Sequence, residues 1–217
     1  MTGRLIDQQI LVDVSPVGMA VYEKRIKAEG EPTSLQLLQA NQAFCHALGL
    51  DKIDLNRSPV NIRNLVMAAA GIFGGKAAEK ALAINVHVDA QVPDYVLGDT
   101  PKLLQVMTNL ISNAVKFTDK GEVEVEVMLH QETEKQTWLQ VKVKDQGIGV
   151  EEAFYEQIFN PFVQADMTVS KRFGGTGLGL SIVKKLVEFM GGTVGVKSRE
   201  TGGSIFDLLL PFDKENP

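Results

Sequence analysis

The segment from Gln105 to Thr118, with the sequence QVMTNLISNAVKFT, constrains the fold more than any other part of the chain. Its apolar residues recur at steps of three and four, which is typical of an amphipathic helix with one face against a core. Asparagine costs roughly 0.5 kcal/mol relative to alanine inside a helix, so the polar face favours a surface that holds an anionic ligand; an ordinary wet helix face is the alternative. The apolar face carries Leu103, Met107, Leu110, Ala114 and Phe117, and the polar face carries Gln105, Asn109, Asn113 and Lys116.

Three glycine clusters follow this helix. Asp145-Gln146-Gly147-Ile148-Gly149 comes after the strand-like residues 138–144, residues 174–180 open a helix, and Gly202-Gly203-Ser204 precedes an apolar run. One G-x-G is weak evidence, because glycine marks many turns and helix ends. The order of an asparagine-bearing helix, an acidic glycine turn, a long loop, a glycine-rich helix start and a last glycine turn is more specific.

This order resembles the N, G1, F, G2 and G3 boxes of the ATP-binding domain of sensor histidine kinases, which belong to the GHKL superfamily with the gyrases, Hsp90 chaperones and MutL-like proteins. Phe159-Asn160-Pro161-Phe162 takes the place of the F box. The resemblance runs from about Val60 to Phe212. It implies that residues 60–213 form an α/β domain of the Bergerat-type ATP-binding fold: a two-layer α/β sandwich with a mixed sheet and about three helices on one face.

Helical and strand-like patterns alternate from residue 60 onward. The segment 150–174 contains one short helical candidate, 151–158, and long segments of this kind are functional lids or disordered stretches. Residues 122–129 and 137–144 are expected to be antiparallel neighbours. Helices are expected at 61–80 (weakened by its glycines), at 100–118 with Thr100 as the cap and at 180–190, and strands at 82–88, within 93–98, and at 122–129, 137–144, 193–198 and 205–210.

The first 58 residues have a different character. Val17 to Tyr22 is strand-like and Asn41 to Leu48 is helix-like. SPVGMAVY followed by QANQAFCHALGL resembles the opening of a PAS sensory domain, but a whole PAS domain is much longer. We therefore expect a partial PAS-like or linker segment at residues 1–58; a generic αβ extension is the alternative.

Composition narrows the classes of partner and compartment. The net charge of −5, without a basic run longer than two residues, argues against nucleic acid. Lone Cys45 cannot form an internal disulfide, and the three histidines lack metal-ligand spacing. The longest uncharged apolar run, Leu65 to Phe73, is too short to span a bilayer. We expect a cytoplasmic chain without membrane contact of its own, whose parent protein would be free to carry a membrane anchor.

The resemblance assigns the polar face of the helix to phosphates and metal. Asn113 is the expected Mg²⁺ ligand, Asn109 supports the phosphates or the waters of the metal, and Lys116 supplies positive charge. An amide oxygen suits Mg²⁺ here because a carboxylate would add repulsion against the phosphates. Phe117 is similar to the aromatic residue that flanks the nucleotide; a plain core phenylalanine is the alternative.

Asp145 is the expected reader of the base. A carboxylate beside glycines, which let backbone approach a ligand closely, can accept a hydrogen bond from the exocyclic amino group of adenine. Guanine would place a carbonyl oxygen there instead, at a cost of roughly 1–3 kcal/mol, so ATP is favoured over GTP. Gly147 and Gly149 are expected to line the base pocket.

The glycine-rich helix start is expected to bind the triphosphate, because exposed N–H groups at a helix start attract anions. Phe159 and Phe162 resemble anchors of an ATP lid, with core packing as the alternative. Arg172, with Lys171, either reaches the γ-phosphate or is a solvated charge. The nucleotide-binding residues expected from this cluster are Gly175, Thr176, Gly177, Leu178, Gly179 and Leu180.

Gln105 stands where water-activating members of the superfamily carry glutamate. Glutamine cannot accept a proton from water, which argues against an efficient ATPase and agrees with phosphotransfer. A histidine kinase also needs a phosphoacceptor histidine in an H-E-x-R-T-P-like run on a helical hairpin, and none of His46, His87 and His130 fits.

We therefore expect an ATP- and Mg²⁺-binding catalytic domain that donates the γ-phosphate to a histidine absent from this chain, with no autophosphorylation of its own. The expected partners are a phosphoacceptor hairpin, in trans or in a parent protein, and a response regulator. The alternatives are a non-catalytic ATP-gated signalling module and a serine-directed kinase of the anti-sigma type.

Overall fold

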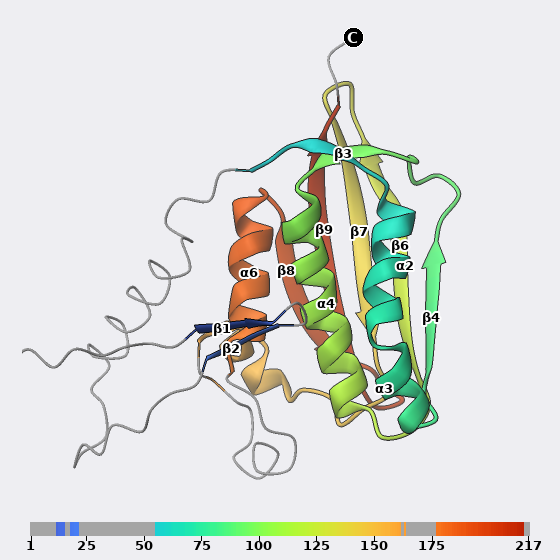
Figure 1. Ribbon diagram of the computed structural model, residues 1–217, viewed down its shortest axis with the longest axis vertical. Coiled ribbons are helices and arrows are strands. Elements are labelled where there is room, and N and C mark those ends of the chain that lie inside the picture. Colours follow the sequence, from blue (N-terminus) through green and yellow to red (C-terminus); the bar gives the residue numbers. More distant parts are fainter. Residues whose placement is uncertain (1–11, 16–17, 22–54, 162, 164–176, 215–217) are drawn as a thin grey trace, which may run out of the picture. The chain divides into compact units, whose positions relative to one another are not determined.

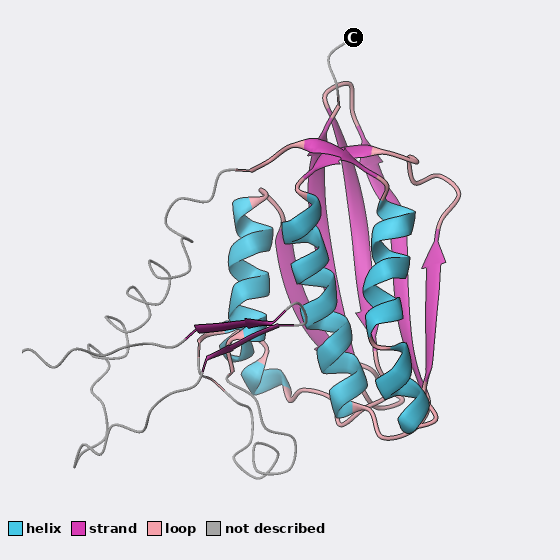
Figure 2. Cartoon of the chain, viewed as in Figure 1, coloured by secondary structure: helices cyan, strands magenta, loops and turns pink. Residues whose placement is uncertain are grey.

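The computed structural model describes residues 12–15, 18–21, 55–161, 163 and 177–214, and it divides the chain into two compact units, Met1–Asp51 and Lys52–Pro217. In the first unit, strands β1 (Val12–Ser15) and β2 (Gly18–Val21) form an antiparallel hairpin (Figure 2). The strand expected near Val17 to Tyr22 is thus confirmed at β2. The helix expected at 41–48 lies outside the described residues, so a PAS-like identity and the boundary at 58–60 stay predictions.

The second unit is a two-layer α/β sandwich, as predicted (Figure 1). Its seven-stranded sheet has the order β3-β5-β9-β7-β6-β4, with β8 paired to β9. Strand β4 runs parallel to β6 and the other pairs are antiparallel, so the sheet is mixed. The strands are β3 (Ser58–Val60), β4 (Ala83–Val88), β5 (Val96–Gly98), β6 (Glu122–Glu132), β7 (Gln136–Lys144), β8 (Thr193–Ser198) and β9 (Ser204–Asp213).

Helices α2, α4 and α6 cover one face of this sheet (Figure 1). The helices cover this face because apolar and polar residues alternate along the strands, which gives the sheet one apolar face. On β6, Val123, Val125 and Val127 are fully buried beneath the helices. The glutamates between these valines lie on the other face, where Glu124 pairs with Lys144 of β7 at 3.6 Å. The helical elements are α2 (Ile62–Ile72), α3 (Gly74–Glu79), α4 (Thr100–Phe117), α6 (Gly179–Phe189) and the 3₁₀ turns η2 (Glu152–Phe154) and η3 (Gln157–Phe159).

Two expectations about helix boundaries are wrong in detail. The helix expected at 61–80 is broken at Phe73, which is buried and ends α2 through its N–H group on the Ala70 and Gly71 carbonyls. Glycine favours this break because it is a poor helix former. The helix expected at 151–158 is instead the pair of 3₁₀ turns η2 and η3.

The apolar face of α4 is wider than the sequence pattern indicated. Val106, Ile111 and Val115 are buried as well, while Phe117 is only half-buried. The reason is that α4 packs against α2, α6 and the sheet together, so more than one narrow stripe is covered. In the part of the chain that the structure describes, no helix combines the length and the apolar character needed to cross a membrane.

Candidate functional site

The polar face of α4 meets the start of α6. A Cβ atom built on Gly179 would lie 3.7 Å from Asn109 Oδ1, so the asparagine helix and the glycine-rich helix start are neighbours. Leu178 is buried beside them and anchors this start, and its carbonyl accepts a hydrogen bond from Ser181 Oγ at 2.8 Å. Two segments 70 residues apart in the sequence (179 − 109) therefore form one polar corner.

The last turn of α4 meets the acidic glycine turn. A Cβ atom on Gly147 would lie 2.4 Å from the carbonyl oxygen of Phe117, closer than any side chain tolerates, so only glycine permits this approach. Lys116 Nζ lies 4.7 Å from the centroid of the Phe117 ring, a cation–π contact. Lys116 is half-buried, and this partial burial lowers the pKa of its ammonium.

Asp145 is buried directly after β7, with 4% of its surface exposed. Its Oδ1 atom accepts hydrogen bonds from the N–H groups of Gly147 at 2.8 Å and Ser204 at 3.2 Å. Burial raises the pKa of Asp145, although these bonds and the charge of Arg199 act in the opposite direction. The two backbone donors converge on one carboxylate oxygen, and the Ser204 side chain donates to the same carboxylate.

The third glycine cluster packs on the same carboxylate residue. Gly203 has φ +94°, and a Cβ atom there would lie 2.0 Å from the Asp145 carbonyl oxygen, so glycine is required on both counts. Gly149 lies against the same cluster: a Cβ atom built on it would lie 3.3 Å from the Gly203 carbonyl oxygen. Ser204 therefore belongs to the site. The sequence interpretation gave it no role, although its place directly after two glycines was a usable signal.

Arg199 is a second residue that the sequence did not indicate. Its Nη1 atom donates to the Asp145 carbonyl oxygen at 3.2 Å and lies 3.7 Å from Glu124 Oε1. The arginine precedes the glycine turn by a few residues and carries no motif of its own, so only the folded arrangement reveals its contact with Asp145.

Of the remaining expected site residues, the structure describes some, and the others lie outside the described ranges. Gln105 and Asn113 are half-buried on α4, in line with Asn109. Phe159 is buried and makes an edge contact with Phe206, with ring centroids 6.5 Å apart, and Lys184 Nζ lies 5.9 Å from its ring centroid. Its burial favours the core-packing alternative. Gly177 precedes α6 with φ +70°, and Leu180 is half-buried in the first turn of α6. Phe162, Lys171, Arg172, Gly175 and Thr176 lie outside the described residues.

The donor set fits a hard cation carried mainly by a phosphate ligand. Among the described residues, no group of three or more His, Cys, Asp or Glu side chains could hold a metal ion. Mg²⁺ commonly takes one or two protein oxygens and completes its shell with water and phosphate oxygens. The Asn113 amide, on the same helix as Asn109, can supply such an oxygen.

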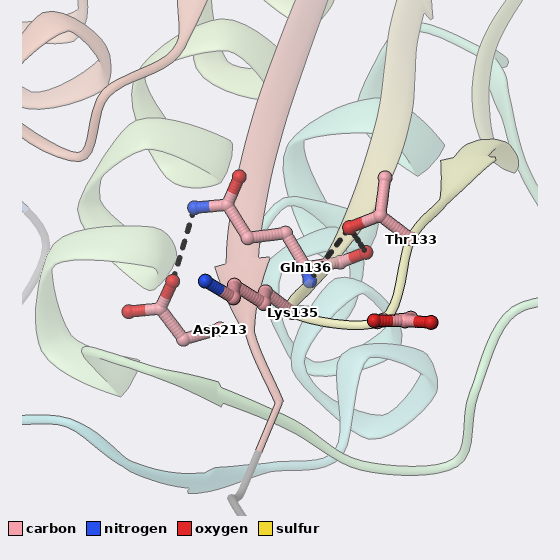
Figure 3. Close-up of a pocket in the computed structure, with 5 residues that line it drawn as sticks. Thr133, Lys135, Gln136 and Asp213 are labelled. Carbon is pink, nitrogen blue, oxygen red and sulfur yellow. Dashed lines mark hydrogen bonds between the residues drawn. The ribbon is translucent and has the colours of Figure 1, made fainter.

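A depression with a volume of about 540 Å³ lies elsewhere, at the β6–β7 hairpin (Figure 3). Gln136 Nε2 donates there to Asp213 Oδ1 at 3.0 Å. The hairpin joins the start of β7, whereas Asp145 follows its end, so the depression and the Asp145 turn lie at opposite ends of the strand. None of the expected site residues lines it; the lining residues are Thr133, Glu134, Lys135, Gln136 and Asp213.

Comparison with known proteins gives a consistent result. Residues 98–214 match the family described as histidine kinase-, DNA gyrase B-, and HSP90-like ATPase. Sensor protein GacS of Pseudomonas syringae pv. syringae is 40% identical over 163 residues, which cover 75% of this chain and 18% of that protein. The signal transduction histidine-protein kinase BarA of Escherichia coli strain K12 is 36% identical over 162 residues, with 75% and 18% covered. The chain thus spans about a fifth of the length of these relatives.

Solved structures are similar as well. Full-length ShkA in complex with AMPPNP matches with a TM-score of 0.65 and 30% identity, covering 87% of this chain and 41% of that one. The nucleotide-free catalytic domain of histidine kinase ThkA matches with a TM-score of 0.58 and 26% identity, covering 72% of this chain and 95% of that one.

Proposed function

The chain belongs to the family of histidine kinase-, DNA gyrase B- and HSP90-like ATPases, and from this premise we propose that its second unit binds ATP with Mg²⁺ and donates the γ-phosphate to a histidine side chain. One observation carries the proposal: the asparagine face of α4 lies between the buried Asp145 turn at one end and the start of α6 along its side. The names of the relatives, sensor and histidine kinases, favour histidine over serine as the acceptor.

Asp145 selects the base. Gly147 and Ser204 donate to this buried carboxylate, and an adenine amino group would add one further donor to it. Guanine offers an acceptor at the same position and is disfavoured. The exposed Ile148, with 63% of its surface accessible between two glycines, lies where a purine would cover it.

The phosphates lie along α4 toward α6. Asn109 and the start of α6 provide amide and N–H donors to anionic oxygens, and Lys116 adds positive charge. Asn113 would hold Mg²⁺, which when bound neutralises phosphate charge and orients the γ-phosphate. Transfer forms a bond between a histidine nitrogen and the γ-phosphorus and breaks the bond to the bridging oxygen, so that ADP leaves.

The acceptor is a histidine on a separate helical hairpin. His87 lies on β4 and His130 on β6, which are strands and not the helical setting that phosphotransfer requires, and His46 lies outside the described residues. Gln105, half-buried on α4, cannot activate water and so leaves the phosphate for the histidine. We place this reaction in the cytoplasm, with a response regulator as the final phosphate acceptor.

A combined binding and transfer experiment tests the proposal. Calorimetry with AMPPNP and Mg²⁺ should show binding to the wild type, and Asp145→Asn should weaken it by about 1–3 kcal/mol. The asparagine oxygen would keep the Gly147 and Ser204 bonds, so its NH₂ group would face the adenine amino group, donor against donor. The same variant should therefore narrow the preference for ATP over GTP. Asp207→Asn, a half-buried carboxylate bonded to Gln140 on β7, is the matched control and should bind like the wild type.

The transfer arm uses γ-labelled ATP and a purified hairpin that carries an H-E-x-R-T-P run. We expect acid-labile label on the hairpin and none retained on the chain alone. Acid-stable label would indicate a serine kinase, and binding without any transfer would indicate an ATP-gated module. Absence of AMPPNP binding by the wild type would overturn the proposal as a whole.

A further inference from the structure

Lys80 reaches the far end of α4 from a distant part of the chain. Its Nζ atom donates to the carbonyl oxygens of Val115, Lys116 and Thr118, each at 2.9 Å, and lies 4.0 Å from the Asp119 carboxylate. Lys80 ends the short helix α3, so the contact spans 35 to 38 residues.

These three bonds close a helix end that has no closure of its own. The last four carbonyls of an α-helix lack partners inside the helix and carry the negative end of its dipole. Many helices solve this with a left-handed residue, usually glycine, directly after the C-cap, but here Asp119 follows the cap Thr118 and its φ is not positive. An ammonium group with three donors and a positive charge supplies what this end lacks.

Two of the carbonyls that Lys80 bonds are the sequence neighbours of the Phe117 carbonyl, which faces the candidate site. Phe117 lies between Lys116 and Thr118, and its carbonyl oxygen is the atom that approaches Gly147 so closely that no Cβ fits. The N–H group of Gly147 in turn donates to Asp145 at 2.8 Å. An unbroken series of contacts thus joins the Lys80 ammonium to the carboxylate that reads the base.

We propose that Lys80 is a positioning residue for nucleotide binding: it fixes the last turn of α4 against the Gly147 turn and so holds Lys116, Phe117 and Asp145 in one arrangement. This inference rests on the proposed function, because it concerns affinity for the nucleotide. Lys80 acts on the nucleotide indirectly, through the backbone carbonyls at the end of α4.

The test compares lysines at the two ends of α4. Lys80→Met keeps the aliphatic stem and removes the three donors, and it should raise the Kd for AMPPNP and Mg²⁺ about three- to thirtyfold. Lys102→Met removes a lysine that bonds Asp99 at the other end of the helix, and it should change this Kd less than twofold. Lys76→Met, on the exposed side of α3, should change neither stability nor Kd. Urea unfolding of each variant gives its free energy of unfolding, so that the Kd values of Lys80→Met and Lys102→Met are compared alongside their losses of stability.

Lys80→Arg should recover part of the affinity, because a guanidinium group can donate to two or more carbonyls. Should Lys80→Met fail to fold, the same Kd comparison is made with Lys80→Gln, which keeps an amide donor. Equal Kd values for wild type and the Lys80 variants, at a temperature where all are folded, would overturn the inference while leaving the proposed function intact. Absence of binding by the wild type would instead remove the proposed function.

Discussion

The two ends of helix α4 are closed by opposite charges that arrive from different distances along the chain. At the N-terminal end, Asp99 directly precedes the helix, and its carboxylate accepts the Lys102 N–H at 3.1 Å, the Lys102 ammonium at 2.6 Å and the Asn56 N–H at 3.0 Å. At the C-terminal end, the Lys80 ammonium comes from another helix. The cap formed by Asp99 on the Lys102 N–H is local, although Asp99 also accepts from the distant Asn56, and it belongs to the stability of the unit. The closure by Lys80 is entirely tertiary and lies beside the candidate site.

Two buried aspartates show the same contrast in their acidity. Burial alone would raise the pKa of Asp99, but the side-chain and backbone hydrogen bonds of Lys102, the bond from Asn56 and the lysine charge outweigh it and lower that pKa. Burial prevails at Asp145, whose pKa is raised. Both carboxylates accept hydrogen bonds, but the donors to Asp99 include the charged Lys102 ammonium, whereas the donors to Asp145 are the uncharged groups of Gly147 and Ser204. A buried carboxylate with a raised pKa is a candidate for binding an external donor.

Gly147→Ala should have the largest effect and acts at the C-terminal end. Its Cβ atom would lie 2.4 Å from the Phe117 carbonyl oxygen, a backbone atom that the Lys80-bonded turn holds in place. We expect a loss of about 3 kcal/mol in the free energy of unfolding, measured in urea, together with loss of AMPPNP binding at temperatures where the variant is folded.

Gly195→Ala is the matched control for this change. Gly195 is exposed on β8, and nothing lies within 4 Å of the position of its Cβ atom. Its stability should change by less than about 0.5 kcal/mol and its nucleotide affinity not at all. If Gly147→Ala kept both its stability and its affinity, the close approach of α4 to the acidic turn would have no importance for the site.

Asp99→Ala should have the next largest effect and acts at the N-terminal end. It removes a helix cap and leaves the Lys102 ammonium and the Asn56 N–H without this acceptor, so we expect about 2 kcal/mol less stability in urea unfolding. The Kd for AMPPNP, measured on the folded variant, should stay within twofold of the wild type. A tenfold rise in that Kd would show that both ends of α4 serve the nucleotide and would remove the contrast between them.

The cap at the N-terminal end of α4 could be predicted from the sequence to within one residue, whereas the Lys80 bonds at its C-terminal end could not. Period and capping chemistry located α4, but they named Thr100 as its cap, and the side chain that accepts the Lys102 N–H is that of the preceding residue, Asp99. Such one-residue errors are expected, because Thr and Asp are both good caps and neighbouring positions compete. Nothing in the sequence around Lys80 indicates which carbonyls it would bond, since its partners lie 35 or more residues away.

The same distinction applies to the site and the core. The glycine clusters could be recognised in the sequence, and they include Gly147 and Gly203, which lie against the Phe117 and Asp145 carbonyl oxygens. Where two backbone segments approach this closely, only glycine fits, so the residue type itself is a signal. Ser204 and Arg199 reach Asp145 only through pairing of β9 with β7 and the turn before it, which no local pattern encodes. Phe117 was assigned to the apolar face of the helix but is only half-buried, because periodicity predicts which face a residue lies on and not how deeply it is buried.

Thr118→Val should have the smallest effect and sharpens the description of the C-terminal end. Thr118 is fully buried, and its carbonyl accepts from Lys80, yet its Oγ1 atom has no hydrogen-bond partner among the described residues. Replacing a buried hydroxyl that makes no bond with a methyl group of similar shape should leave stability unchanged or raise it by up to about 1 kcal/mol. Thr118→Ser, which keeps the hydroxyl and deletes the methyl, should instead cost about 1 kcal/mol. Urea unfolding separates the two variants, and calorimetry with AMPPNP completes the comparison. If valine weakened nucleotide binding at unchanged stability, the hydroxyl would belong to the binding site, and the C-terminal end of α4 would contribute a side chain there as well as the backbone that Lys80 holds.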